Sequence, residues 1–203
     1  LFANKQTMAQ IDIKRHYELA EEGLLYINQH AEADLLIHNY TPEVQYERKW
    51  MPETLLCRGL ITDLQGNIVA RPFEKFFNLD EHLEYYGPMP NEPFDVYEKM
   101  DGSLGILYFL NGEAKIATRG SFSSEQALRA MKILRAKYAS VIFDPDFTYM
   151  FEIIYPENRI VVNYGDQEDL VLLGVTRTAT GEEIALNAVD IAMPKVKHYD
   201  GIK

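Results

Sequence analysis

Two apolar runs separated by a single Asn-Gly pair constrain the fold more than any other feature of the sequence. Residues 104–110 and 113–118 are rich in β-forming side chains and are joined only by Asn111-Gly112. Asn-Gly suits a two-residue turn with positive φ at both positions, and such a turn joins antiparallel strands. The sequence therefore predicts an antiparallel hairpin near the middle of the chain.

Further strands and helices are expected on both sides of this hairpin. A helix is predicted over residues 124–138, where Ser123 and Gln126 have capping-box spacing ahead of periodic apolar residues. A second, amphipathic helix is predicted over residues 8–27. The additional predicted strands are residues 55–63, 68–72, 147–155, 160–163 and 170–176. Runs of strands with segregated helices predict an α+β fold of antiparallel sheets and packed helices.

The length and composition are those of one globular unit. The 203 residues are 47% hydrophobic, which is enough to bury a sizeable core. We expect a single domain over residues 1–203, with an N-terminal helical and strand segment (1–50), a motif-bearing core (51–182) and a C-terminal segment (183–203). No apolar run approaches the roughly 20 residues that span a bilayer, so a cytoplasmic protein without membrane contacts is expected. Cys57 is the only cysteine, which excludes an internal disulfide and predicts no cysteine-based zinc site.

The charge balance argues against a broad nucleic-acid-binding face. The formal net charge is -11, whereas phosphate contacts normally come with a basic surface. The central third of the chain nevertheless carries several cations: Arg58, Arg71, Lys75, Lys99 and Arg119. A local cationic pocket within an acidic protein is therefore expected.

Lys99 is the candidate nucleophile, in the sequence Lys99-Met100-Asp101-Gly102-Ser103. It lies between one expected strand and a Gly-containing turn that leads into the next. Such a turn with a solvated lysine beside it is common, so an ordinary structural role stands against a catalytic one. The complete Lys-x-Asp-Gly-Ser pattern is much less common by chance than its Asp-Gly pair.

Other motifs accompany Lys99 in a fixed order. They are Cys57-Arg58-Gly59, Arg71-Pro72-Phe73-Glu74-Lys75-Phe76-Phe77-Asn78, Thr118-Arg119-Gly120-Ser121, Phe151-Glu152-Ile153-Ile154 and Pro156-Glu157-Asn158-Arg159-Ile160-Val161. In this order the chain resembles the phage-type ATP-dependent RNA ligases. These belong to the covalent nucleotidyltransferase superfamily of polynucleotide ligases and mRNA capping enzymes, whose first motif is Lys-x-Asp-Gly. The resemblance covers roughly residues 55–182.

This resemblance implies a nucleotidyltransferase (ATP-grasp-like) adenylation domain that acts in RNA or tRNA repair. Lys99 attacks the α-phosphate of ATP to form lysyl-AMP, AMP passes to an RNA 5′-phosphate, and that end is sealed to a 3′-hydroxyl. The implied catalytic residues are Lys99, Asp101 and Gly102, and the implied nucleotide-binding residues are Arg58, Lys75, Phe77, Glu98, Arg119 and Glu152. Mg²⁺ or Mn²⁺ is implied near Asp101 and Glu152, through water.

Each implied role has an ordinary structural alternative. Arg58 could be a partly buried ion-pair residue, and Phe76 and Phe77 could be core aromatics. Glu152 lies either on a solvated face or is buried for a purpose, and Asp101 could serve only as a turn residue. The five histidines show no metal-ligand spacing and are assigned no chemistry: His16, His30, His38, His82 and His198.

Two later motifs of the resembled family do not follow Glu182. These are an acidic-Gly strand and a Lys-x-Lys pair; Lys195-Val196-Lys197 has the letters of the pair but comes too early, so it is interpreted as a surface segment. A partial adenylation domain, weak or inactive alone, is therefore expected. The alternatives are a non-catalytic nucleotide- or RNA-binding fragment and a DNA ligase or capping-type nucleotidyltransferase.

Overall fold

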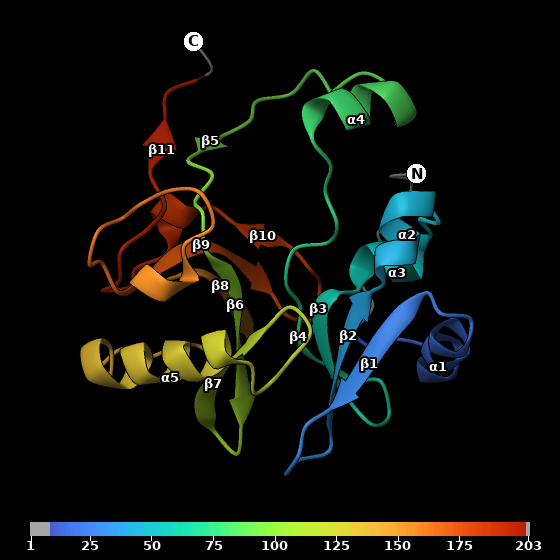
Figure 1. Ribbon diagram of the computed structural model, residues 1–203, viewed down its shortest axis with the longest axis horizontal. Coiled ribbons are helices and arrows are strands. Elements are labelled where there is room, and N and C mark those ends of the chain that lie inside the picture. The colour runs from blue at the N-terminus through green and yellow to red at the C-terminus, as the bar shows by residue number, and fades with distance from the viewer. Residues whose placement is uncertain (1–8, 202–203) are drawn as a thin grey trace.

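A computed structural model describes residues 9–201 and contains two large antiparallel sheets (Figure 1). The first sheet has the order β1 (Leu25–Gln29), β2 (Leu35–Tyr40), β3 (Arg58–Asp63), β4 (Ile68–Ala70). The second has the order β10 (Glu183–Ile184), β9 (Asp169–Arg177), β8 (Phe147–Ile154), β6 (Ser103–Leu110), β7 (Glu113–Thr118). A small sheet pairs β11 (His198–Tyr199) with β5 (Val96–Tyr97). The predicted α+β class with antiparallel sheets is confirmed.

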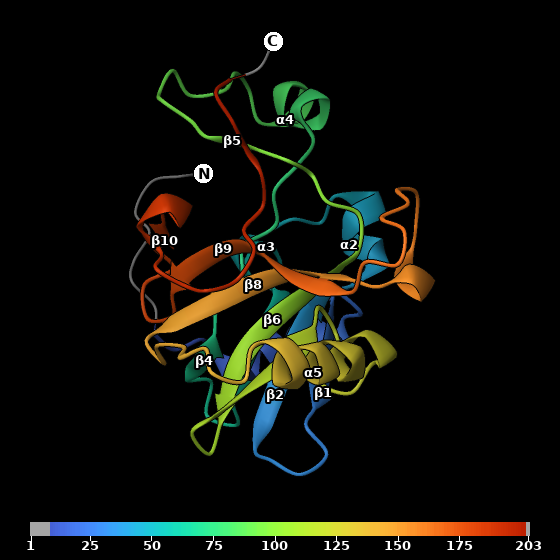
Figure 2. The same ribbon diagram turned by 90° about the vertical axis from the view of Figure 1, so that its left-hand side faces the viewer.

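The helices lie on the outer sides of the sheets except for α4 (Leu79–Tyr85), which stands apart from them at the top of the view (Figures 1 and 2). They are α1 (Ile13–Glu21), α2 (Pro42–Glu47), α3 (Pro52–Leu56), α4 (Leu79–Tyr85) and α5 (Glu125–Lys137), with short 3₁₀ turns η1 (Pro156–Asn158) and η2 (Leu186–Ala188). The first three pack on the first sheet through a core that includes Leu19, Val44 and Leu60, whereas α5 packs on the second through Ala130 and Ile133. A third core cluster joins the two sheets face to face.

Strands β2 and β3 are buried on both faces because they lie between helices and the second sheet. In β3, Leu60 belongs to the core beneath the helices, while its neighbour Ile61 belongs to the core between the sheets. Ile106 of β6 meets Ile61 in that inter-sheet core. A strand with two covered faces needs continuous rather than alternating apolar residues, as β3 has.

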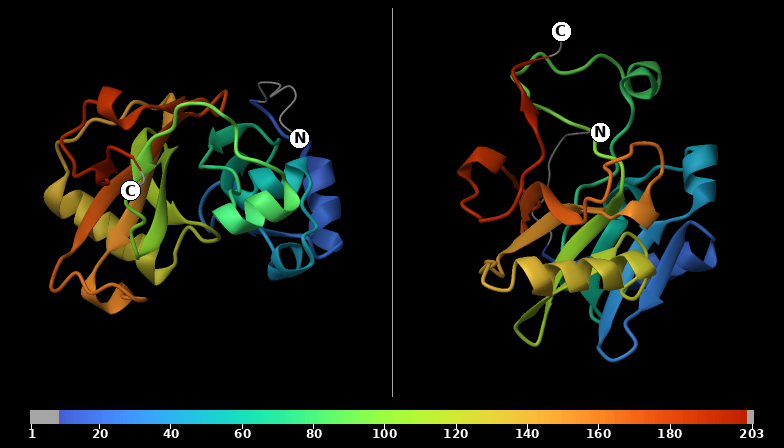
Figure 3. Two further views of the ribbon diagram at one scale, coloured as in Figure 1. Left: turned by 90° about the horizontal axis from the view of Figure 1, so that it is seen from above. Right: turned by 60° about the vertical axis from the view of Figure 1, so that its left-hand side comes forward.

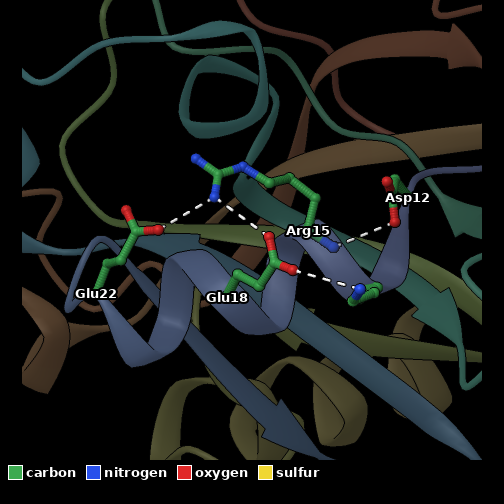
Figure 4. Close-up of polar contacts among 5 residues, drawn as sticks. Asp12, Arg15, Glu18 and Glu22 are labelled. Carbon is green, nitrogen blue, oxygen red and sulfur yellow. Dashed lines mark hydrogen bonds and ion pairs between the residues drawn. The ribbon is translucent and has the colours of Figure 1, made fainter.

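The helix predicted over residues 8–27 is wrong in its second half. The helix is limited to Ile13–Glu21, and Leu25–Gln29 forms β1 against β2. Asp12 caps the N-terminus by accepting a hydrogen bond from the Arg15 backbone N–H at 3.1 Å (Figure 4). Gly23, with φ of 78°, then reverses the chain in a conformation that disfavours continued helix. Met8, the first residue of the prediction, lies outside the described residues.

The central hairpin is confirmed. Strands β6 and β7 pair from Gly105–Thr118 to Leu110–Glu113, and the turn residues Asn111 and Gly112 have φ values of 53° and 80°. The helix that follows is also confirmed, but its cap differs from the prediction. Ser124, not Ser123, is the N-cap, and its side chain accepts a hydrogen bond from the Ala127 backbone N–H.

Several other predicted segments change at their ends or in type. The strand predicted from residue 55 begins only at Arg58, because α3 occupies Pro52–Leu56, and the strand predicted over 68–72 ends at Ala70. Residues 147–155 and 170–176 are strands as predicted, within one or two residues, as β8 and β9. Residues 160–163 are not a strand: they form a loop held by the Asp101 side chain.

The segment around Lys195 is not simply a surface segment. Val196 is buried in the core beside the second sheet, and its backbone N–H donates to the Leu172 carbonyl at 2.9 Å. The Lys195 ammonium donates to the Leu186 carbonyl at 2.9 Å. Apolar packing at the middle residue therefore fixes the segment against β9, while Lys197 remains exposed. None of the helices in residues 9–201 combines the length and apolar character needed to cross a bilayer.

Candidate functional site

A cleft of about 1360 Å³ is lined by residues from both large sheets and from the segment that carries β5. The first sheet contributes Asn39 and Arg58, and the second contributes Glu152 and Gly174. Figure 3, seen from above, shows the two halves of the molecule side by side, with the green segment between α4 and β6 crossing over them. Residues far apart in the sequence therefore meet in one space.

Lys99 is exposed at this cleft, between β5 and β6. The preceding residue, Glu98, also lines the cleft, and its backbone N–H donates to the Lys197 carbonyl at 2.8 Å. The pairing of β5 with β11 thus holds the chain just before Lys99. The short strand and the turn into β6 together present the amine to the cleft.

Glu152 of β8 faces the turn that follows Lys99. Burial raises the pKa of its carboxyl group, while the Gly102 backbone N–H and the charge of Lys99 oppose that rise. Gly102 approaches so closely that a Cβ atom there would lie 2.5 Å from the Ile153 carbonyl oxygen. The absence of a side chain at position 102 therefore allows the Lys-x-Asp-Gly turn to rest against β8.

Three further cations, Arg58, Lys75 and Arg119, lie close enough together to act on one another electrostatically. Burial lowers the pKa of the Arg58 guanidinium, and the neighbouring Arg119 lowers it further. Burial also lowers the pKa of Lys75, with Arg58 and Arg119 adding to the effect. Within residues 9–201, neither these three side chains nor Lys99 has a carboxylate within ion-pair distance. The positive charges of these side chains are therefore free to interact with a bound anion.

The backbone from residue 71 to residue 75 connects the two sheets beside these cations. The Arg71 backbone N–H donates to the Thr148 hydroxyl of β8 at 2.9 Å, and that of Lys75 donates to the Leu55 carbonyl of α3 at 2.8 Å. Between them, the Phe73 ring lies over β9 where a Cβ on Gly174 would be 2.1 Å away. The segment is thus fixed at both ends along the cleft.

Lys75 and Phe77 do not line the cleft itself. The Lys75 ammonium lies 4.9 Å from the centre of the Phe77 ring, which stacks on Tyr86 at 4.6 Å. Phe76 does line the cleft: it is 62% exposed, and its ring centre lies 5.0 Å from the Arg58 guanidinium carbon. Of the two neighbouring phenylalanines, it is therefore Phe76, considered above only as a core aromatic, that presents an exposed ring to the cleft.

Asp101 also points away from the cleft. Its Oδ2 atom accepts hydrogen bonds from the backbone N–H groups of Val161 at 2.6 Å and Val162 at 2.7 Å. These bonds hold the pKa of the Asp101 carboxyl below its usual value. The Asp101 backbone N–H donates to the Tyr164 hydroxyl at 3.0 Å. Asp101 thus joins the turn after Lys99 to the loop that follows η1.

Tyr40 was not among the site residues predicted from the sequence. Its hydroxyl accepts a hydrogen bond from Arg119 at 3.4 Å, and a hydrogen bond with Tyr40 opposes the lowering of the Arg58 pKa by burial. A tyrosine at the end of an apolar strand has the appearance of a core residue, and its pairing with the two arginines depends on contacts between the sheets. No local sequence signal indicates them.

A second cluster was also missed: His16, His38 and Cys57 lie together under the first sheet. Their candidate ligand atoms lie within 4.8 Å of one another, and all three residues are buried. The expectation that a lone cysteine rules out a cysteine-based metal site overlooked histidines brought in from other elements. Separations of 22 and 41 residues along the chain hid this grouping.

Several known proteins resemble this chain in sequence. A family model described as RNA ligase matches residues 56–198. A protein of Autographa californica nuclear polyhedrosis virus, described as a bifunctional polynucleotide kinase/RNA ligase, is 32% identical over 190 residues, which cover 81% of this chain and 27% of that protein. An RNA ligase of Rhodothermus phage RM378 is 27% identical, over 77% of this chain and 44% of the relative. The chain therefore spans less than half the length of these relatives.

A solved structure supports the fold at lower sequence similarity. A protein from Aquifex aeolicus described as an ATP-dependent DNA ligase superimposes with a TM-score of 0.52 and 14% identity, covering 92% of this chain and 50% of that one. At this identity the comparison bears on the fold alone. The arrangement of sheets is thus one found in a nucleotidyltransferase-type protein.

Proposed function

Because the chain belongs to the RNA ligase family, we propose that it carries the ATP-dependent adenylation step, with Lys99 as the nucleophile. The neutral amine of Lys99 attacks the α-phosphorus of ATP, a P–N bond forms, and pyrophosphate leaves with the electron pair of the broken P–O bond. AMP then passes from Lys99 to an RNA 5′-phosphate. Finally, a 3′-hydroxyl attacks that phosphate and AMP leaves.

The observation that carries this proposal is the set of cations without carboxylate partners around Lys99. Arg58 and Arg119 both line the cleft. Lys75 lies close enough to these two arginines for their positive charges to lower its pKa. Arg58 and Lys75 are partly buried, and a partly desolvated cation is stabilised by an anionic partner. A triphosphate supplies that partner, and the same groups stabilise the charge that develops during transfer.

The cleft also offers aromatic surface for a base. Phe76 and Phe94 are 62% and 72% exposed, and both line the cleft. Large exposed aromatic rings become favourable when a planar ligand covers them. We therefore assign Phe76, in addition to the expected Phe77, to the nucleotide site, with Glu98 at its edge.

Glu152 fits a hydrated Mg²⁺ or Mn²⁺ ion. These ions prefer oxygen ligands and are usually held by one or two carboxylates, phosphate oxygens and water. Glu152 is a buried carboxylate with a raised pKa in a cleft that also holds cations for phosphate, so a cation there would restore its charged form. The ion would neutralise phosphate charge. Asp101 is assigned a positioning role, because its Oδ2 already binds two backbone N–H groups.

Transfer of label from α-labelled ATP to the protein tests the nucleophile. We expect acid-labile, alkali-stable label on the wild-type chain, as for a phosphoramidate, and none on Lys99→Ala. Lys132→Ala is the matched control, since Lys132 is an exposed lysine of α5 far from the lining residues. Label that persists on Lys99→Ala at the wild-type level would overturn the assignment.

Competition and end-joining assays test the substrate class. Unlabelled ATP is expected to suppress labelling much more than GTP, since GTP preference belongs to capping-type enzymes. Pre-adenylated RNA supplied with a 3′-hydroxyl end isolates the sealing step from the first step. Sealing of DNA ends in preference to RNA ends would contradict the RNA assignment, and nucleotide binding without any label would indicate a binding module.

A further inference from the structure

His16, His38 and Cys57 form a compact buried cluster outside the cleft. His16 lies on α1, His38 on β2 and Cys57 directly after α3, so the cluster ties two helices to the first sheet. The three side chains are almost completely buried, with exposures of 2%, 0% and 0%. Nothing in the adenylation chemistry uses them.

The hydrogen bonds of Thr62 fix the tautomer of His38. The Thr62 hydroxyl donates its one proton to the Asp63 carbonyl at 2.9 Å, so it must accept at its other contact, 2.9 Å from His38 Nε2. His38 Nε2 therefore carries the ring proton, and the lone pair of His38 Nδ1, which faces His16 Nδ1 at 3.3 Å, could bind a metal ion in place of that contact. A histidine ligand whose second ring nitrogen donates to a neighbouring oxygen is the usual arrangement around protein-bound metals.

The distances from His16 Nδ1 to the other two groups suit the ligands of a tetrahedral ion. His38 Nδ1 lies 3.3 Å from His16 Nδ1, and Cys57 Sγ lies 3.7 Å from His16 Nδ1. Bonds of about 2.0–2.1 Å to nitrogen and about 2.3 Å to sulfur place two nitrogen ligands about 3.3 Å apart. The same bonds place nitrogen and sulfur about 3.6 Å apart. The observed separations are thus close to the edges of one coordination tetrahedron.

The protonation states of the histidines also suit a metal. Burial lowers the pKa of His16 to about 4 and that of His38 to about 3, so both rings are neutral at neutral pH. Burial raises the pKa of the Cys57 thiol, which stays protonated unless a cation displaces the proton. Glu53 acts electrostatically on both His16 and Cys57 and supplies negative charge beside a divalent ion.

We propose that His16, His38 and Cys57 bind one divalent cation of the zinc class through two Nδ1 atoms and a thiolate. Binding forms the metal–sulfur bond and releases the thiol proton to solvent, with no change of oxidation state. Two imidazoles and one thiolate favour a borderline ion such as Zn²⁺ over Mg²⁺, which prefers oxygen. The next residues along the chain, Arg58 and Asn39, line the cleft, so the ion would hold the cleft's wall on the first sheet.

Substitution with Co²⁺ tests the site by spectroscopy rather than by activity. The complete 203-residue chain is stripped with a chelator under reducing conditions, and Co²⁺ is added. We expect intense visible ligand-field bands of a tetrahedral ion, a thiolate-to-metal band in the near ultraviolet, and saturation at one equivalent. Cys57→Ala should lose the thiolate band, and His38→Gln should weaken binding by about 10-fold or more.

His198→Gln is the control, since His198 is an exposed histidine outside the cluster. It should keep the wild-type spectrum. Zn²⁺ should displace Co²⁺ and raise the thermal midpoint of the wild-type chain but not that of Cys57→Ala. If a substituted chain fails to fold, the wild-type spectrum still decides. Weak octahedral bands without a thiolate transition would mean that the three groups form only a hydrogen-bonded core cluster, and would overturn the proposal.

Discussion

At Glu152, the demands of folding and of the proposed chemistry oppose each other. Its folded-state pKa is raised, mainly by burial, so the unfolded chain gives up this proton at lower pH than the folded chain does. The stability linked to this group is therefore complete below its unfolded pKa and is lost as pH rises through the folded pKa. Ionisation of this carboxyl group is therefore a cost to the fold.

Replacing Glu152 by Gln separates the two effects. As pH rises above the ordinary pKa of a glutamate carboxyl, about 4.3, the wild-type chain should lose stability relative to Glu152→Gln, because only the wild type ionises. Label transfer from ATP should fall by about 10-fold to 100-fold in the same variant, since the metal loses its charged partner. Denaturant unfolding across this pH range and the labelling assay measure the two quantities. Parallel pH profiles would contradict the buried, ionisable state of Glu152.

A substitution at Gly102 tests how closely the turn after Lys99 packs against β8. Gly102→Ala would place Cβ 2.5 Å from the Ile153 carbonyl oxygen, so β6 and β8 must move apart there. We expect a loss of about 1–3 kcal/mol in the free energy of unfolding, the usual cost of overpacking. Gly120→Ala is the control: its nearest atom would be 4.0 Å away, and its φ is not in the left-handed region. Equal losses in the two variants by denaturant unfolding would contradict this geometry.

Among the elements, α5 offers the clearest test of a local capping contact. The Ser124 side chain accepts from the Ala127 backbone N–H at 3.2 Å and also contacts the Thr118 hydroxyl at 2.8 Å. Ser124→Ala should therefore cost about 1 kcal/mol in the free energy of unfolding, up to about 2. Ser123→Ala is the matched control and should change it by less than about 0.5 kcal/mol. A larger loss of unfolding free energy for Ser123→Ala than for Ser124→Ala would mean that Ser123 is the N-cap, as the sequence predicted.

Local signals predicted elements well where neighbouring residues decide the structure. The hairpin of β6 and β7 follows from Asn111-Gly112, which can adopt positive φ within the turn itself. Residues 25–27 were assigned to the end of a helix because their apolar spacing allowed it, but pairing with β2 makes them part of a strand. Long-range pairing overrides local spacing when a neighbouring strand offers unpaired hydrogen-bonding groups.

The same distinction applies to the candidate site. Motif order indicated Arg58, Lys99 and Glu152, which the structure places around one cleft, although their roles stay predictions. The sequence could not show that Asp101 binds the loop at residues 161 and 162, or that Phe76 rather than Phe77 lines the cleft. Those facts depend on side-chain direction and on chain crossings between sheets. Neither is encoded in spacing along the chain.

For the whole molecule, charge distribution limits how RNA can be held. The net charge is -11, yet Arg58, Arg119 and Lys99 lie at one cleft between the two sheets. A net negative charge repels phosphate at long range, and the cleft gathers three cations that have no carboxylate within ion-pair distance among residues 9–201. The proposed RNA substrate should therefore contact this chain through few phosphates, close to the end that reacts.

Salt dependence measures that number of phosphates. For a single-stranded 5′-phosphorylated RNA, each neutralised phosphate contributes about −0.7 to the slope of log K against log salt concentration. If RNA contacts only the cations of the cleft, about four phosphates at most are neutralised. The slope of log K against log salt concentration, measured by fluorescence anisotropy, should then be no steeper than about −3. Arg119→Gln should make the slope shallower by about 0.7, whereas Arg135→Gln, an exposed arginine on α5, should leave it unchanged. A slope several times steeper, insensitive to Arg119, would place RNA on another face of the molecule and would separate RNA binding from the cleft that holds Lys99.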